Sequence, residues 1–243
     1  MREPRIYVEQ ALDCGQTMAL QQDASHHVSR VLRMRVGRRL WLFNGRGGNY
    51  LAEIVSISRH QVDVTLLEFN DEQQESTLKI TLAQGVSRTQ HMDYTLQKAV
   101  ELGVSKIVPV ITEFGNVQFD QQREQKKLLH WQLIIISACE QSGRNSVPEI
   151  LTPMPLSQWL ETDNNSLKVL LQPGAGLRLS ALQLANSSLS LLSGPEGGFS
   201  RAEAEQAVSR GYVSVGLGPR VLRTETAAVA AISVCQTLWG DMG

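Results

Sequence analysis

Three glycine- and proline-rich stretches in the last third of the chain have the residue types that a binding site needs. Each follows a short apolar run: "VLLQPGAG" (169–176), "LLSGPEGG" (191–198) and "VGLGPRVLRTET" (215–226). One such stretch alone indicates a tight turn, because Gly and Pro are the usual turn residues. Three at the same end of one sheet would line a cavity with backbone, since glycine lets main chain approach a ligand closely. The sequence therefore predicts a small-molecule site able to hydrogen-bond a flat heterocycle.

Three arginines in or beside distinctive sequence motifs could supply positive charge to a reaction. Arg144 lies in "EQSGR", and Arg220 and Arg223 flank the third stretch. A guanidinium stays charged at any physiological pH, and positive charge placed in advance stabilises an anion that develops during a reaction. Each of these residues is equally well explained as a surface or ion-pairing arginine. The residues alone leave both interpretations open.

The elements that must position these residues alternate between strand and helix after residue 76. Apolar runs such as "LKITLAQGV", "KIVPVIT" and "LKVLLQP" are typical of buried strands. Helices are expected around 92–103, at about 121–141, over 155–162, from 200 to 210 and from 224 to 239. This alternation predicts an α/β domain with a mostly parallel sheet. In such sheets ligands bind beyond the carboxyl ends of the strands.

The first part of the chain has a different pattern. Short β-type runs at 5–8, 17–20, 38–43, 49–57 and 61–69 surround one short helix, which predicts a small β-barrel over residues 1–70. The polar segment 71–76 reads as a linker, and 77–243 as the second domain. The barrel sequence carries a basic cluster without an intervening acid: Arg30, Arg33, Arg35, Arg38 and Arg39. The cluster is either a solvated surface or an edge that contacts phosphates.

The composition and the absence of common motifs limit the class of protein and of cofactor. The 243 residues carry a net charge of -1 and 42% hydrophobic residues, which argues against bulk coating of nucleic acid. No apolar run is long enough for a transmembrane helix and no signal peptide is visible, so a cytoplasmic protein is expected. The spacing of the cysteines and histidines favours neither a disulfide framework nor a metal site. P-loop and dinucleotide-binding motifs do not occur, which favours a cofactor without a pyrophosphate.

Four motifs carry a resemblance to a known family: "LLSGPEGGFS", "LGPRVLRTETA", "QKAVELGVSKIVP" and "WQLIIISACEQSGR". Together they resemble the RsmE-type 16S ribosomal RNA uridine-N3 methyltransferases of the SPOUT superfamily, and the likeness covers essentially the whole chain. The resemblance implies an α/β SPOUT-type C-terminal domain with a deep trefoil knot and a PUA-like N-terminal β-barrel. It further implies S-adenosyl-L-methionine as cofactor, 16S rRNA of the small ribosomal subunit as substrate, and a homodimer.

The resemblance also assigns roles to individual residues. Catalytic roles would fall to Arg144, Arg223 and Arg220, because methyl transfer to uridine N3 needs the N3 proton to leave and the resulting anion to be stabilised. RNA contacts would fall to Arg5, Arg30, Arg33 and Arg35. The cofactor-binding residues would be Leu171, Gln172, Pro173, Gly194, Pro195, Glu196, Gly197, Gly198, Leu217, Gly218, Leu222, Arg223, Thr224 and Thr226.

Some features leave alternatives open. The family often has an arginine where this chain has Phe114, an aromatic that either stacks on a base or is buried. The general base is not visible in the motifs, so hydroxide or a carboxylate remains open. Two other functions compete with the first: a SPOUT enzyme acting on another RNA, such as a tRNA ribose 2′-hydroxyl, and a non-catalytic RNA-binding assembly factor. The intact "GPEGG" and "LRTETA" motifs favour the enzyme.

Overall fold

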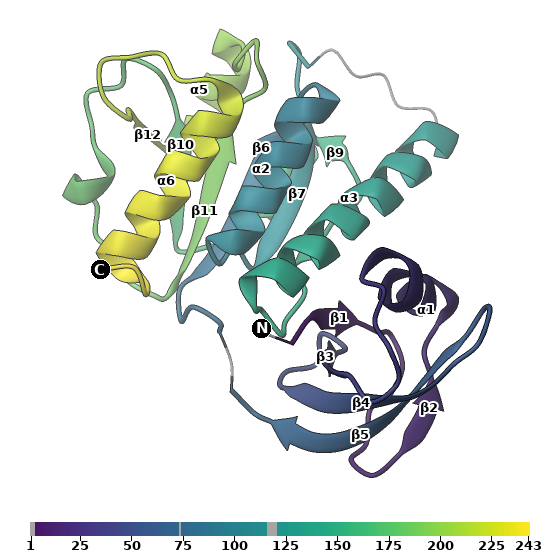
Figure 1. Cartoon of the computed structure of the whole chain (residues 1–243). Coiled ribbons are helices and arrows are strands. Elements are labelled where there is room, and N and C mark those ends of the chain that lie inside the picture. Colours follow the sequence, from purple (N-terminus) through teal and green to yellow (C-terminus); the bar gives the residue numbers. More distant parts are fainter. Residues whose placement is uncertain (1–2, 73, 116–120) are drawn as a thin grey trace. The chain divides into compact units, whose positions relative to one another are not determined.

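The computed structural model describes residues 3–72, 74–115 and 121–243 (Figure 1). The chain divides into two compact units. The N-terminal unit comprises residues 1–75 together with 139–147, and the C-terminal unit comprises 76–138 and 148–243. The sequence placed the whole of 77–243 in the second domain. It did not predict that 139–147, at the end of a long helix, would pack with the first.

The N-terminal unit is built on a five-stranded sheet in the order β1-β3-β4-β5-β2. Its strands are β1 (Arg5–Tyr7), β2 (Thr17–Ala19), β3 (Arg39–Phe43), β4 (Asn49–Ile57) and β5 (Val62–Asn70). The short helices α1 (Gln22–His26) and η1 (His27–Val31) follow β2. The apolar residues that alternate along β4 and β5, such as Ile54 and Val64, are fully buried in one core. Among the described residues the pairing leaves β1 and β2 at the two edges, so the ladder is open where a barrel was expected.

The C-terminal unit is built on a seven-stranded sheet in which every pairing is parallel. Its main path runs β12-β10-β11-β6-β7-β8, and β9 also pairs with β7. The strands are β6 (Lys79–Gly85), β7 (Lys106–Ile111), β8 (Glu149–Ile150), β9 (Met154–Pro155), β10 (Leu167–Leu171), β11 (Ser188–Ser193) and β12 (Val213–Val215). The predicted parallel α/β sheet is confirmed.

Helices cover both faces of this sheet. Figure 1 shows α2, α3 and α6 on one face, and α2 contacts α6. On the other face α4 and α5 pack on a core that includes Ala83, Val108 and Leu192 of the strands. The helices are α2 (Thr89–Glu101), α3 (Gln121–Ser142), α4 (Leu156–Thr162), α5 (Arg201–Ser209) and α6 (Thr224–Trp239), with a 3-10 turn η2 at Leu179–Ala181.

Strands buried between two helix layers are covered on both faces, which explains why their sequences are rich in apolar residues. The strand β6 illustrates this pattern, because six of its seven residues, all but Lys79, are buried. The helix α2 ends where Gly103 adopts a φ of +83°, a left-handed conformation that glycine adopts at little cost. Within the described ranges, no helix has the length and hydropathy needed to cross a membrane.

Candidate active site

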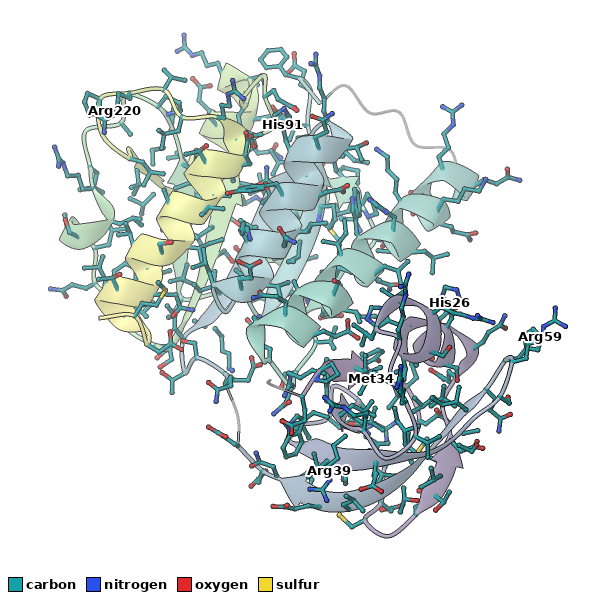
Figure 2. The ribbon with its side chains drawn as sticks, in the orientation of Figure 1. His26, Met34, Arg39, Arg59, His91 and Arg220 are labelled. Atoms are coloured by element: carbon teal, nitrogen blue, oxygen red, sulfur yellow. The ribbon has the colours of Figure 1, made fainter. Side chains whose placement is uncertain are left out.

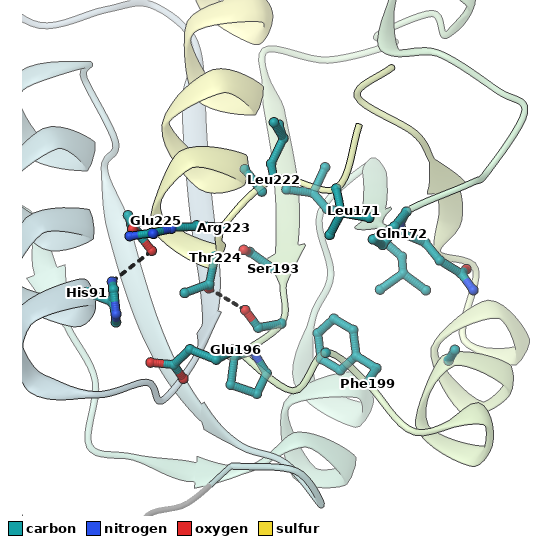
Figure 3. A pocket seen from close by; sticks show the side chains of 18 residues that line it. His91, Leu171, Gln172, Ser193, Glu196, Phe199, Leu222, Arg223, Thr224 and Glu225 are labelled. Atoms are coloured by element: carbon teal, nitrogen blue, oxygen red, sulfur yellow. Dashed lines mark hydrogen bonds and ion pairs between the residues drawn. The ribbon is translucent and has the colours of Figure 1, made fainter. Parts of the chain in front are cut away.

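A cavity of about 730 Å³ lies beyond the carboxyl ends of β10 and β11 (Figure 3). Its volume falls in the range of small-molecule sites, which is about 300–1,000 Å³. Two of the three glycine-rich stretches reach it directly, and the third reaches it just before α6. Of the residues predicted to bind a cofactor, those on its wall are Leu171, Gln172, Pro173, Gly194, Pro195, Glu196, Gly198, Leu222, Arg223 and Thr224. The structure therefore gathers most of the predicted set around one space.

Hydrogen bonds between three distant segments hold the base of the cavity together. Gln84, at the end of β6, donates through Nε2 to Thr224 Oγ1 at 3.0 Å and to the Gly194 carbonyl at 3.2 Å. Thr224 Oγ1 in turn donates to the same Gly194 carbonyl at 2.5 Å. Gln84 is fully buried and Thr224 nearly so. The Thr224 side chain thus fixes the first turn of α6 to the loop after β11, and Arg223 is the N-cap residue of this helix.

The loop between β11 and α5 is fixed at both of its ends. Ser200 caps α5 in a capping box with Glu203, which satisfies amide groups at the start of the helix. Glu196 Oε1 accepts a hydrogen bond from the backbone N–H of Arg88 at 2.9 Å. Glu196 therefore ties this loop to the start of α2, while the capping of α5 is left to Ser200.

The two adjacent glycines of this loop differ in what they face. Gly198 lines the cavity with a φ of +70°, and apart from its chain neighbours no atom of the described residues lies within 4 Å of the place where its Cβ would be. Gly197 does not line the cavity. A Cβ there would lie 2.8 Å from Cβ of Phe114, so this glycine makes room for Phe114. The cofactor-binding role of Gly197 stays a prediction. Phe114 itself is 47% exposed and is not a buried aromatic.

The loop between β12 and α6 contributes less to the cavity than the sequence suggested. Leu217, Gly218 and Arg220 line a much smaller hollow of about 40 Å³, which shares part of its wall with the cavity, namely Leu171, Gln172, Pro173, Leu222 and Ala227. Thr226 is exposed and lines neither space. Only the end of this loop, with Leu222 and Arg223, reaches the main cavity.

A histidine and a glutamate on the cavity wall were missed by the sequence analysis. His91 Nδ1 lies 3.0 Å from Glu225 Oε2, and Figure 3 shows the pair between α2 and α6. Figure 2 places His91 near the start of α2 and Arg220 on the loop before α6. His91 belongs to no recognisable motif. The only signal was its position in the first turn of a helix that follows a strand's carboxyl end.

Arg144 lies elsewhere in the fold. Its side chain is 3% exposed and binds Glu75 through two hydrogen bonds, from Nε at 3.1 Å and from an Nη atom at 2.6 Å. Both residues belong to the N-terminal unit, and Arg144 is not among the residues that line the cavity. The catalytic role suggested for it stays a prediction, with a structural role now visible beside it.

The basic cluster of the N-terminal unit surrounds a hollow of about 790 Å³. Four of its arginines line this hollow: Arg33, Arg35, Arg38 and Arg39. Arg30 is exposed outside it. Arg5 is engaged differently, because an Nη atom donates to Asn145 Oδ1 at 2.5 Å and its guanidinium lies over the Phe43 ring. Of the predicted RNA-binding residues, the structure therefore brings together Arg33 and Arg35 only.

This architecture is that of an α/β protein with a small-molecule site at the carboxyl edge of its sheet. Comparison with known families adds the type of protein. The profile of an RNA methyltransferase domain matches residues 74–236, and that of an RNA methyltransferase PUA domain matches residues 20–67. The chain belongs to the RNA methyltransferase family that these two domains define.

Named relatives agree over nearly the whole length. The ribosomal RNA small subunit methyltransferase E of Buchnera aphidicola subsp. Schizaphis graminum is 38% identical, with 99% of this chain and 98% of the relative covered. The Bacillus subtilis protein of the same name is 30% identical, with 94% of each chain covered.

Solved structures show the same fold. The ribosomal RNA small subunit methyltransferase E from Neisseria gonorrhoeae, bound to S-adenosyl methionine, superimposes with a TM-score of 0.93 at 39% identity over 100% of both chains. The Legionella pneumophila protein Lpg2936, in complex with its bound cofactor SAM, gives a TM-score of 0.97 at 41% identity, over 99% of this chain and 100% of the other.

Proposed function

We propose that this chain methylates small-subunit ribosomal RNA, using S-adenosylmethionine, at N3 of one specific uridine in 16S rRNA. The observation that carries the proposal is the cavity of about 730 Å³ lined by the backbone of the glycine-rich loops, with a cation and a proton acceptor on its wall. Support comes from the two relatives solved with this cofactor, which align over nearly the full chain.

The residues of the cavity fit the cofactor. Gly198 leaves open space where any other residue would place a Cβ, so a ligand could pack directly on its main chain. Leu171 and Leu222 offer apolar surface, and the backbone near Gln172 and Gly194 offers polar groups for a heterocycle. The bound cofactor would supply an electrophilic methyl group on its sulfonium centre.

The remaining chemistry falls to side chains on the wall. Uridine N3 carries a proton that must leave before or as the methyl group arrives, and the ring then becomes anionic. Arg223 lines the cavity and would stabilise that anion, because its charge is present before the reaction starts. His91 Nδ1 lies 3.0 Å from Glu225 Oε2, so this carboxylate favours the neutral tautomer with its proton on Nδ1, in which Nε2 is an acceptor. We infer that the proton leaving uridine N3 passes to the His91–Glu225 pair.

A side chain that fills the cavity should prevent cofactor binding. Ala227 lies in the first turns of α6 and lines the cavity, so Ala227→Phe adds a ring there without straining the backbone. We expect the Kd for S-adenosylmethionine to rise at least about tenfold, or about 1.4 kcal/mol, in isothermal titration calorimetry. The matched control is Thr226→Phe, on the exposed neighbouring position. Equal affinities in the two variants would place the cofactor elsewhere.

The N-terminal unit would hold the RNA through its basic hollow. Arg33 has a φ of +51°, a left-handed conformation that is uncommon outside glycine and that often marks functional sites. Arg33 and Arg35 present two guanidinium groups to one space, and such groups match phosphate oxygens well. We infer that this hollow contacts the rRNA backbone.

Replacing both arginines should weaken RNA binding in a salt-dependent way. In Arg33→Gln/Arg35→Gln the slope of log K against log salt should fall by about two, because each lost phosphate contact removes about one. Cofactor affinity should not change. The control removes the same charge from Arg46 and from Arg59, which lies at the tip of the β4–β5 hairpin (Figure 2). An unaltered slope in the first variant would make the cluster a solvated surface.

We further propose that the chain forms a homodimer. Apolar side chains are exposed on two helices of the C-terminal unit: Leu129 and Leu133 of α3 are 61% and 64% exposed, and Val234 and Leu238 of α6 are 38% and 40% exposed. Apolar surface of this kind is typical of faces that a partner covers.

We also infer a knotted C-terminal unit. Gly216 lies so close to the backbone of Ala175 that a Cβ on Gly216 would collide with the Ala175 carbonyl oxygen. Thr224, only eight positions later, binds the carbonyl of Gly194. The segment just before α6 thus contacts two earlier loops, and this proximity supports a trefoil threading.

A further inference from the structure

A second, smaller hollow in the C-terminal unit has the features of an anion site. It has a volume of about 150 Å³ and lies between the start of α2 and α3. Because one water occupies about 30 Å³, the hollow has room for a phosphate group and a few waters. Its polar and basic lining residues are Ser87, Thr89, Lys126, Lys127 and His130. None of these residues lines the larger cavity.

Ser87 provides the observation that points to a ligand. The residue is 2% exposed, and its Oγ atom has no hydrogen-bond partner among the described residues. A buried hydroxyl without a partner costs about 1–3 kcal/mol of free energy. Such a group is therefore expected to have a partner that binds to the protein. Ser87 lines the hollow, so a ligand there is within reach of the hydroxyl.

The start of α2 adds a favourable field. The helix has 13 residues, and its N-cap residue Arg88 makes no side-chain cap hydrogen bond. The N–H groups of a first helical turn and the helix dipole together attract anions. Thr89, the first residue of this helix, also lines the hollow.

The lysines contributed by α3 complete the site. Lys127 lies 6.0 Å from the centroid of the Trp131 ring, and burial lowers the pKa of Lys127, partly offset by the nearby carboxylate of Asp93. A partly desolvated ammonium group is stabilised by an anion beside it. Two carboxylates lie near the site: Asp93 Oδ2 is 2.9 Å from His130 Nε2, and Glu196 Oε1 accepts a hydrogen bond from the backbone N–H of Arg88 at the start of α2. Two lysines and a helix N-terminus thus lie near two carboxylates, each of which already has a partner.

We propose that this hollow binds a phosphate of the RNA backbone, and the proposal rests on the RNA substrate assigned above. The first turn of α2 links the two spaces, because His91 lines the large cavity whereas Thr89 and Met92 line the hollow. A strand whose target base enters the cavity therefore passes close to the hollow. A phosphate held there would fix the backbone of the strand next to the base that is methylated.

Ser87→Ala separates this role from a purely structural one. Removing a hydroxyl that has no partner should leave the free energy of unfolding unchanged or raise it. RNA affinity should nevertheless fall, by about tenfold or more, since one hydrogen bond to a charged group is lost, worth about 1.5 kcal/mol at the low end. Chemical denaturation and filter binding of small-subunit rRNA to the full chain measure the two quantities. Unchanged RNA affinity would overturn the proposal.

The lysines give an independent readout. In Lys126→Gln/Lys127→Gln the salt slope of RNA binding should fall by about one to two, and calorimetry should show an unchanged affinity for S-adenosylmethionine. Lys79→Gln removes one positive charge at the start of β6, at the opposite end of the sheet. It is the control for the loss of a lysine charge outside the hollow. A variant that loses the cofactor as well would make the hollow part of the cofactor site and overturn the proposal. A wild-type chain that binds RNA but no cofactor would contradict the proposed function and leave this site intact.

The same groups could bind a free anion. A separate experiment distinguishes free phosphate from a phosphate of the RNA backbone. Inorganic phosphate is titrated alone while the backbone amide signals of Ser87 and Thr89 are followed by NMR. Weak binding that RNA displaces is the expected result. Tight phosphate binding, together with unchanged RNA affinity in the lysine variant, would assign the hollow to a free anion and overturn the assignment to RNA.

Discussion

Arg223→Ala should lower the rate of methyl transfer by about 10²–10³-fold, the usual cost of losing one group that stabilises developing charge. The guanidinium matters chiefly when uridine becomes anionic, so the loss should appear in the rate and not in the Kd of S-adenosylmethionine. Single-turnover methylation of small-subunit RNA at saturating cofactor measures it.

Arg220→Ala is the matched control for this experiment. It removes the same charge three positions earlier, from a residue that lines only the smaller neighbouring hollow. We expect a much smaller loss of rate. If Arg220→Ala transfers the methyl group slowly and Arg223→Ala does so at the normal rate, Arg220 stabilises the anion in place of Arg223.

Arg144→Ala should destabilise the protein by about 3–5 kcal/mol, because it leaves the carboxylate of Glu75 with no partner for the two hydrogen bonds it accepts. The measurement is chemical denaturation. Restoring an uncharged pair in Arg144→Met/Glu75→Leu should recover much of this stability, since a buried ion pair is often replaceable by apolar residues.

The outcome also decides between two roles for Arg144. A variant Arg144→Ala that is as stable as the wild type but slow in methylation would favour the catalytic role predicted from the motif "EQSGR". A destabilised variant whose folded fraction methylates at the normal rate would make Arg144 a residue that joins the segment 139–147 to the N-terminal unit.

The sequence predicted those strands and helices whose bounds are set by neighbouring residues in the chain. Strands buried on both faces are rich in apolar residues, so β6, β7, β10 and β11 were predicted close to their observed bounds. Helix α5 was bounded equally well, because a Ser at the N-cap and a Glu three residues later is a local signal. The two-residue strands β8 and β9 were missed, since so short a segment has no periodicity.

Contacts between distant residues could not be predicted in this way. Glu75 and Arg144 are 69 positions apart, and nothing in either neighbourhood indicates the other. His91 and Glu225 pair across two helices for the same reason. The glycines of "GPEGG" show a further limit: the sequence indicates that a Cβ would be harmful, but the fold decides whether it would meet Phe114, as at Gly197, or the open cavity, as at Gly198.

The hydrogen bonds that join Gln84, Gly194 and Thr224 also constrain the order in which the protein matures. Gln84 is 110 residues from Gly194 and 140 from Thr224, and closing such long loops is slow compared with forming local structure. During synthesis the strands β6, β10 and β11 emerge before α6 does. The nascent chain therefore has no complete cavity, and no methyltransferase activity, until α6 has left the ribosome and docked.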